Sequence, residues 1–123
     1  MAEEIRWAFQ NADMDKIDEL LKKGLDPNKP LGSNGRRPIH VASDYGHLNV
    51  IQKLVESGAD VNVKDTNGIE PLFDTICEGH VSCAKFLLEK GANANGTGPD
   101  GSPYITSADN SEIKELLKSH GAK

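Results

Sequence analysis

The sequence predicts an all-α solenoid in which short helix–turn–helix units stack side by side. Three glycines, Gly35, Gly68 and Gly101, stand 33 residues apart, and each follows an asparagine or an aspartate. The segments 35–62 and 68–95 share G-x-x-P, then G-H, then an apolar run, then G-A-(D/N)-x-N, without a gap. A fixed period of this length is typical of repeat proteins, whose units bury their apolar faces against their neighbours.

Each unit is predicted to contain a short helix, a turn, a second helix and an extended finger loop. Proline is tolerated in the first turn of a helix, and glycine ends helices in the left-handed conformation. The residues expected to set these limits are Pro38, Pro71, Gly46, Gly79, Gly58 and Gly91. The second helix carries apolar residues on one face in both central units, namely Leu48, Ile51, Leu54 and Val55, then Val81, Ala84, Leu87 and Leu88.

Both ends of the chain depart from the pattern as capping units would. The segment 7–28 keeps only the second half of the repeat, and 101–123 keeps a shortened version. Gly101 to Gly121 spans 20 residues, three fewer than the 23 between the matching glycines of each central unit. We expect one domain, 1–123, with repeats at about 1–33, 34–66, 67–99 and 100–123.

Composition disfavours several classes of function. The 123 residues carry a formal charge of −5, which disfavours nucleic acid or an anionic membrane as a partner and favours a basic protein surface. Two cysteines are too few for a secreted disulfide framework. The N-terminus has no apolar run, and no segment reaches the roughly 18 apolar residues of a membrane span. We therefore expect a protein of the cytoplasm or the nucleus.

The central units resemble the ankyrin-repeat family. The tetrapeptides RPIH (37–40) and EPLF (70–73) stand at the family's T-P-L-H position. The segment 46–62 follows the family pattern G-H-x-x-V-x-x-L-L-x-x-G-A-D-V-N almost throughout. This resemblance implies an ankyrin solenoid that binds proteins, with two full central repeats between an N-terminal and a C-terminal capping repeat.

The resemblance also implies a structural role for one histidine. In the family, the histidine of the tetrapeptide hydrogen-bonds the backbone between neighbouring units, which is the role expected of His40. Phe73 and Thr106 stand at this position in the later units, so the bond is expected to be absent there.

A narrower resemblance is to small four-repeat ankyrin proteins that sequester the heterodimeric actin capping protein. It rests on 7-WA-8, 35-GRRPIH-40, 42-ASDYG-46, 78-EGHVSC-83, 98-GPDG-101 and 108-ADNSEIKELL-117. The resemblance implies that the chain occupies the surface by which capping protein binds filament barbed ends, so that filaments keep elongating. We expect the chain to be a monomer. The alternative is an adaptor that docks on a Rel-family transcription factor or another cytosolic protein with no link to actin.

Variable positions of an ankyrin stack lie on the loop tips and on the concave face of the first helices. The partner-binding residues expected there are Trp7, Arg36, Arg37, Asp44, Tyr45, Asp74, Glu78 and His80. With Asp65 and Glu70, the carboxylates form an acidic strip that suits a basic partner, and the aromatic side chains would anchor it. Three alternatives stay open: Trp7 as a cap on the end of the stack, His80 as a turn residue, and the charges as solvated surface.

The stretch 77-CEGHVSC-83 has a Cys-x-x-His-x-x-Cys spacing that resembles a metal site when taken alone. Within the repeat, however, 79–80 matches 46–47, which is the turn between two helices. The cysteines correspond to Asp44 and Val50 one unit earlier, so the repeat does not maintain the spacing. Structural zinc takes four ligands, and a fourth is absent. We expect neither a metal nor another cofactor.

An enzymatic function is also disfavoured. The available pairs are Cys77 or Cys83 with His80, and His40 with Asp44. None of these pairs has a third group to orient the base, and ankyrin stacks offer grooves where catalysis needs a pocket. We therefore expect a binding protein without catalytic residues.

Overall fold

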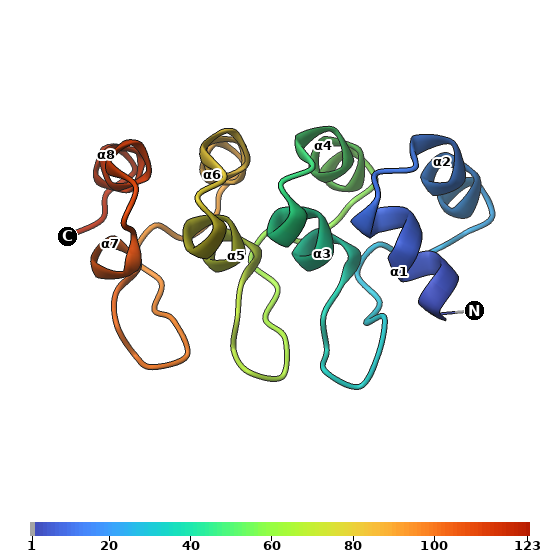
Figure 1. The fold of residues 1–123 in the computed structure, drawn as a ribbon, viewed down its shortest axis with the longest axis horizontal. Helices are drawn as coiled ribbons and strands as arrows, with labels where there is room; N and C mark the ends of the chain where they lie inside the picture. Colours follow the sequence, from blue (N-terminus) through green and yellow to red (C-terminus); the bar gives the residue numbers. More distant parts are fainter. Residues whose placement is uncertain (1) are drawn as a thin grey trace.

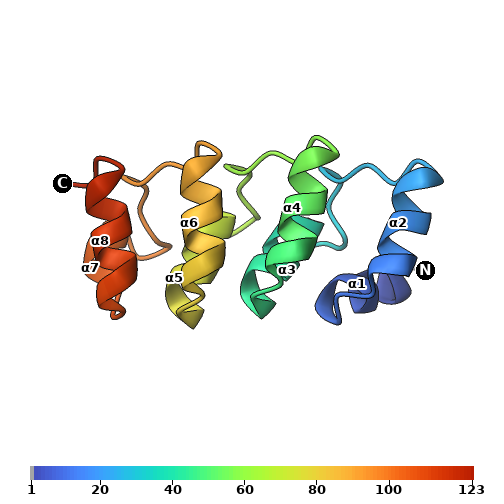
Figure 2. The same cartoon turned by 90° about the horizontal axis from the view of Figure 1, so that it is seen from above.

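The computed structural model describes residues 2–123, which form a row of four helix pairs and contain no extended strand (Figure 1). The inner helices are α1 (Ala2–Gln10), α3 (Pro38–Tyr45), α5 (Pro71–Glu78) and α7 (Tyr104–Ser107). The outer helices are α2 (Met14–Lys22), α4 (Leu48–Glu56), α6 (Val81–Glu89) and α8 (Ser111–Ser119). The termini lie at opposite ends of the row (Figures 1 and 2). The finger loops extend beyond the inner helices (Figure 1). The predicted all-α solenoid is confirmed.

Proline and glycine set the limits of the central inner helices. Pro38 and Pro71 begin α3 and α5, where the missing N–H costs no helical hydrogen bond. Gly46 and Gly79 follow these helices with φ of 74° and 72°, in the left-handed region. Gly46 meets a second constraint, because a Cβ there would lie 2.6 Å from Nδ1 of His80. The next repeat packs directly on this turn.

The outer helices bury one apolar face, as their sequence pattern predicts. Ile51 and Leu54 in α4 and Leu87 in α6 are completely buried. Gly58 and Gly91 follow these helices with φ of 98°, and the chain turns there towards the next unit. The core is therefore continuous along the row and lies between the two layers of helices.

Three asparagines clamp each loop to the repeat that follows it. The side-chain amides of Asn28, Asn62 and Asn95 each donate, at 3.0 Å, to the carbonyl of the glycine that ends the next outer helix. Their carbonyl oxygens each accept a backbone N–H two residues beyond that glycine. The asparagine that ends the repeat pattern is therefore a structural residue.

Histidines at the turns also join neighbouring repeats. Nε2 of His47 donates to the carbonyl of Gln10 at 2.6 Å, and Nε2 of His80 donates to the carbonyl of Asp44 at 2.9 Å. A carbonyl can only accept, so Nε2 carries the proton in both rings. Neither side chain caps its own helix.

The tetrapeptide histidine makes the bond that the ankyrin resemblance implies. Nε2 of His40 donates to the carbonyl of Ile69 at 2.8 Å, and Nδ1 accepts from the N–H of Arg37 at 3.0 Å. Burial is the main reason that the pKa of His40 is lowered, and the bond to Ile69 opposes this effect. The neutral ring is the form that satisfies both bonds.

A different contact joins the third repeat to the fourth. Phe73 stands at the position of His40, and its ring stacks on Tyr104 with centroids 5.9 Å apart. The hydroxyl of Tyr104 donates to the carboxylate of Glu70, which is buried. Glu70 is therefore not part of an exposed acidic strip, which corrects the expectation from the sequence. Glu70 directly precedes α5, and its side chain contacts Tyr104, which is the buried residue of α7.

The C-terminal pair is shortened, as its spacing predicts. Helix α7 has 4 residues, whereas α3 and α5 have 8. Asn110 then begins α8 by accepting the N–H groups of Glu112 and Ile113. No helix among residues 2–123 is long and apolar enough to cross a membrane.

Candidate protein-binding surface

Two large aromatic side chains stand out on the inner helices. Trp7 in α1 is 54% exposed and Tyr45 in α3 is 50% exposed, while the other large apolar side chains of the described residues are more buried. Tyr45 is held by stacking on His47, with centroids 6.1 Å apart. Exposed aromatic side chains on a folded surface are typical of interface anchors.

Carboxylates continue this surface towards the third repeat. Glu78 is exposed at the end of α5, and Asp44 is half-buried at the end of α3. Cys77 lies beside them and is exposed. Partial burial, together with the carboxylates of Asp74, Glu78 and Asp44, raises the pKa of its thiol. The thiol therefore stays protonated at neutral pH and is a weak nucleophile.

Arg36 and Asp74 differ from the expectation that both lie free on the surface. Nη2 of Arg36 is 3.0 Å from Oδ2 of Asp74, and Nη1 is 3.0 Å from Oδ2 of Asp65. Asp65 and Asp74 are only 7% and 8% exposed. The guanidinium enters the seam between the second and third repeats, because two buried carboxylates there need a cation. The exposed acidic strip is therefore shorter than the sequence suggested.

The two carboxylates bound to Arg36 titrate differently. Burial alone would raise the pKa of Asp65, but the N–H groups of Ile69 and Asn67 and the guanidinium outweigh it and lower the pKa. Burial raises the pKa of Asp74 to about 7 against the opposing effect of Arg36. The negative charges of Asp44 and Asp65 add to this rise. Two acids compete for one arginine, and Asp74 is the one that holds its proton more tightly.

Arg37 and His80 are also held by contacts within the protein. Nη1 of Arg37 donates to the carbonyl of Lys64 at 2.9 Å, and Nε donates to the carbonyl of Asn28 at 3.2 Å. His80 is half-buried and bonded to the preceding repeat. The eight predicted side chains thus divide into two groups. Trp7, Asp44, Tyr45 and Glu78 lie at the surface, while Arg36, Arg37, Asp74 and His80 join structural elements.

A cavity of about 170 Å³ lies between α1, α3 and the finger loop that joins α2 to α3. Its lining consists of Arg6, Gln10, Asn34, Arg36, Val41, Asp44 and Tyr45. The sequence interpretation missed Arg6 and Gln10. The repeat register contained a signal, because the alignment that places Trp7 opposite Val41 also places Arg6 opposite His40, whose side chain points into the seam between repeats.

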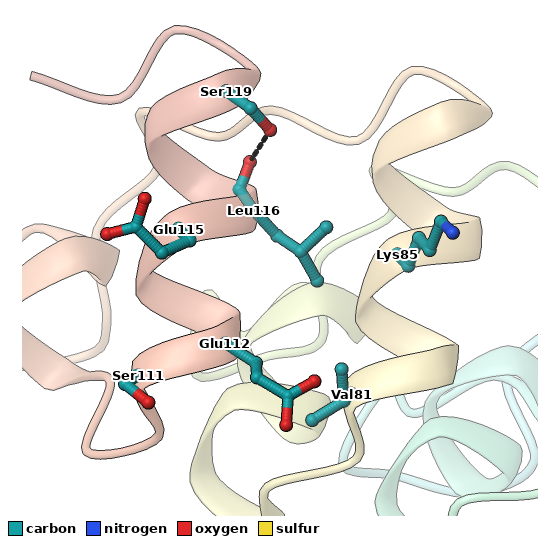
Figure 3. Close-up of a pocket in the computed structure, with 7 residues that line it drawn as sticks. All are labelled: Val81, Lys85, Ser111, Glu112, Glu115, Leu116 and Ser119. Atoms are coloured by element: carbon teal, nitrogen blue, oxygen red, sulfur yellow. Dashed lines mark hydrogen bonds between the residues drawn. The ribbon is translucent and has the colours of Figure 1, made fainter.

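A wider groove of about 550 Å³ lies on the outer face, between α6 and α8. Val81 and Leu116 project into the gap between these helices, whereas the ammonium of Lys85 points away from α8 (Figure 3). The Ser119 hydroxyl donates to the carbonyl of Leu116 at 2.9 Å (Figure 3). The side chains that line the groove include no nucleophile paired with a base, so they do not form a catalytic site.

The two cysteines do not form a joint site with His80. Cys83 is buried in α6, and burial raises the pKa of its thiol to about 11. Cys77 is exposed at the end of α5. Among residues 2–123, no three His, Cys, Asp or Glu side chains are arranged to hold a metal ion.

Comparison with known proteins is consistent with this geometry. Residues 5–98 match the family described as ankyrin repeats (3 copies). The chain is 43% identical to myotrophin of Xenopus tropicalis over 114 residues, which cover 93% of this chain and 96% of that protein. It is 40% identical to myotrophin of Xenopus laevis over the same shares. An ankyrin repeat-containing protein of Schizosaccharomyces pombe is 44% identical over 47% of this chain but only 29% of its own length.

Proposed function

Because this chain belongs to the ankyrin-repeat family of protein-binding modules, we propose that its specific partner is the heterodimeric actin capping protein. The observation that carries the proposal is the 43% identity to a myotrophin over 96% of that protein's length. The small ankyrin proteins that this chain resembles sequester capping protein. By the same action, this chain would hold capping protein in the cytoplasm and leave filament barbed ends free to elongate.

The proposed mechanism is steric occupation. The inner surface is defined by the exposed residues Trp7, Tyr45 and Glu78 together with the half-buried Asp44. This surface would cover the basic region by which capping protein contacts actin. The carboxylates and the net charge of −5 would raise the association rate with such a region, and added salt would reduce this effect. Trp7 and Tyr45 would supply most of the binding free energy, because large aromatic side chains dominate interfaces.

A barbed-end elongation assay tests this proposal directly. Capping protein is added to growing actin filaments until elongation stops, and this protein is then titrated in. We expect elongation to recover in proportion to the protein added. If a several-fold excess of the correctly folded protein restores no elongation, the proposal is wrong, and a partner unrelated to actin, such as a Rel-family transcription factor, takes its place.

A Trp7→Ala variant tests the surface. We expect its affinity for capping protein to fall by about 30-fold, as the loss of an aromatic anchor typically costs 2 kcal/mol or more. Leu116→Ala is the matched control, because it removes a half-buried apolar side chain from the outer groove. Unchanged far-UV circular dichroism of both variants would exclude unfolding as the cause. An unchanged affinity of Trp7→Ala would place the interface away from α1.

A further inference from the structure

The cavity beside α1 contains an arginine that is not among the binding residues expected from the sequence. Arg6 lines it together with Gln10, Asn34 and Tyr45. Among residues 2–123, Arg6 forms no ion pair, in contrast to Arg36, which holds two carboxylates. Arg6 is therefore a cation on the inner surface that is available to a partner.

The guanidinium of Arg6 lies against the finger loop. Its Nη2 lies 3.0 Å from the place that a Cβ of Gly32 would occupy, so the guanidinium rests against the bare backbone of that residue. Arg6 stands at the tetrapeptide position that His40 holds in the next repeat. A side chain there points into the seam between repeats, and the longer arginine reaches the cavity.

Three charged side chains line the cavity: Arg6, Arg36 and Asp44. Arg36 already pairs with Asp65 and Asp74, so Arg6 and Asp44 are the two opposite poles that have no ion pair within the described residues. Arg6 enters from α1, and Asp44 enters from the end of α3. No ion pair joins the two residues. The remaining polar lining includes the side-chain amides of Gln10 and Asn34, which can donate hydrogen bonds to an oxygen near Arg6.

The volume limits what can enter. Small-molecule sites usually measure about 300–1,000 Å³, so a cavity of about 170 Å³ suits one side chain better than a whole ligand. Tyr45 borders the cavity, so a partner segment bound over its ring would place a side chain there. Trp7 follows Arg6 in the sequence but points to another side of α1, where it lines a separate hollow with Asp13 and Lys16.

We propose that the cavity receives an acidic side chain of capping protein, which pairs with Arg6, while a neighbouring basic side chain of the same segment pairs with Asp44. This inference rests on the proposed function and specifies its chemistry. The partner segment is therefore dipolar, with an acidic and a basic residue close together. The two poles fix its direction on the surface, since a reversed segment would place like charges together.

The test is the equilibrium affinity of purified capping protein for charge variants of this chain. We expect Arg6→Gln to weaken binding about tenfold and Arg6→Glu about 100-fold, since a half-buried charge is left unpaired on the partner. Lys85→Gln is the matched control, because it removes the same charge from an exposed position on the outer face. It should change affinity less than about twofold. The thermal midpoint of Arg6→Gln should match the wild type, because Arg6 has no ion pair to lose.

The double variant Arg6→Asp/Asp44→Arg reverses the two poles. It should bind capping protein more weakly than Arg6→Asp alone or Asp44→Arg alone. If it restores wild-type affinity, the two charges serve only each other, and the inference is overturned. If the wild type binds tightly and Arg6→Gln binds equally well, the inference is wrong while the proposed function stands. If the wild type does not bind capping protein at all, the proposed function is wrong and the inference is overturned with it.

Discussion

Arg36 and Asp74 lie in consecutive repeats and form an ion pair whose Nη2 and Oδ2 atoms are 3.0 Å apart. Asp65, from the loop between the same two repeats, binds the other nitrogen of the guanidinium. The Arg36 side chain is 21% exposed, whereas the side chains of Asp65 and Asp74 are 1% and 10% exposed. One cation thus offsets two buried carboxylates at the centre of the solenoid.

Removing this cation should destabilise the fold. We expect Arg36→Met to lower the free energy of unfolding by about 2 kcal/mol, which is less than the 3–5 kcal/mol typical of breaking a buried ion pair. The loss is smaller because Asp74 can accept a proton at neutral pH, since its pKa is about 7. Urea unfolding followed by circular dichroism measures the change.

A second substitution checks this explanation. In the Arg36→Met background, Asp74→Leu removes the carboxylate that has lost its partner and should recover part of the stability. An Arg36→Met protein as stable as the wild type would mean that the guanidinium contributes only at the surface. The sequence expectation of a free loop-tip charge would then hold after all.

The raised pKa of Asp74 predicts an unusual dependence of stability on pH. The folded protein keeps the Asp74 proton up to about pH 7, whereas the unfolded chain releases it near the ordinary value of 3.8. Between these values the folded state binds more protons, so stability falls as the pH rises. We expect the unfolding free energy of the wild type minus that of Asp74→Asn to fall from pH 4 to pH 7 and then to level off.

Parallel urea titrations of both proteins at several pH values measure this difference. Carboxylates away from Arg36 titrate alike in both proteins, so their effects cancel. Asp65 shares the guanidinium with Asp74, but its pKa is lowered below 3.8, which confines its effect to the acid end of the range. A difference that grows as the pH rises towards 7 would show that Arg36 outweighs burial at Asp74. Asp74 would then be an ordinary salt-bridged carboxylate with a depressed pKa.

The fold was predictable because its determinants are local. Pro38 and Gly46 mark the two ends of α3 through their own backbone preferences, without any distant partner. The 33-residue period then places each unit relative to the next, since stacked repeats contact only their neighbours. The exposed aromatics Trp7 and Tyr45 follow from the same register.

The distinction between exposed and buried charges was not predictable in this way. Asp74 and Asp44 have the same chemistry and both lie on inner helices, yet of the two only Asp74 forms an ion pair with Arg36. The bonds of Arg36 to Asp65 and Asp74 join residues 29 and 38 positions apart. Which loop cation enters which seam depends on packing in three dimensions, and the periodic pattern does not record it.

His40 predicts a pH effect of the opposite sign. Burial lowers its pKa below the ordinary value of 6.5, and Nδ1 must stay unprotonated to accept from Arg37. Below pH 6.5 the unfolded chain binds more protons at this residue than the folded protein, so its contribution to stability falls as the pH decreases. We expect His40→Phe to lose this dependence and about 2 kcal/mol of stability at pH 7, because the Arg37 N–H and the Ile69 carbonyl lose their partner.

Thermal and urea unfolding of His40→Phe test this prediction between pH 5 and pH 7.5. His47→Phe is a useful comparison, since His47 donates one bond to Gln10 and has no resolved bond at Nδ1. If His40→Phe is as stable as the wild type, aromatic packing of the kind that Phe73 provides is sufficient at this position.

The buried pair Tyr104 and Glu70 should control the stability of the C-terminal unit. Tyr104→Phe keeps the ring stacked on Phe73 but leaves the buried Glu70 carboxylate without its hydroxyl donor. We expect a loss of about 2 kcal/mol, the size typical of a hydrogen bond to a charged group. Glu70→Gln in the same background should recover part of this loss, because a neutral amide costs less to bury than a carboxylate. Hydrogen exchange resolves the effect by region. Relative to the wild type, Tyr104→Phe should speed exchange of the α8 amides more than that of the α4 amides. An equal change in both helices would mean that the pair does not hold the fourth unit in place.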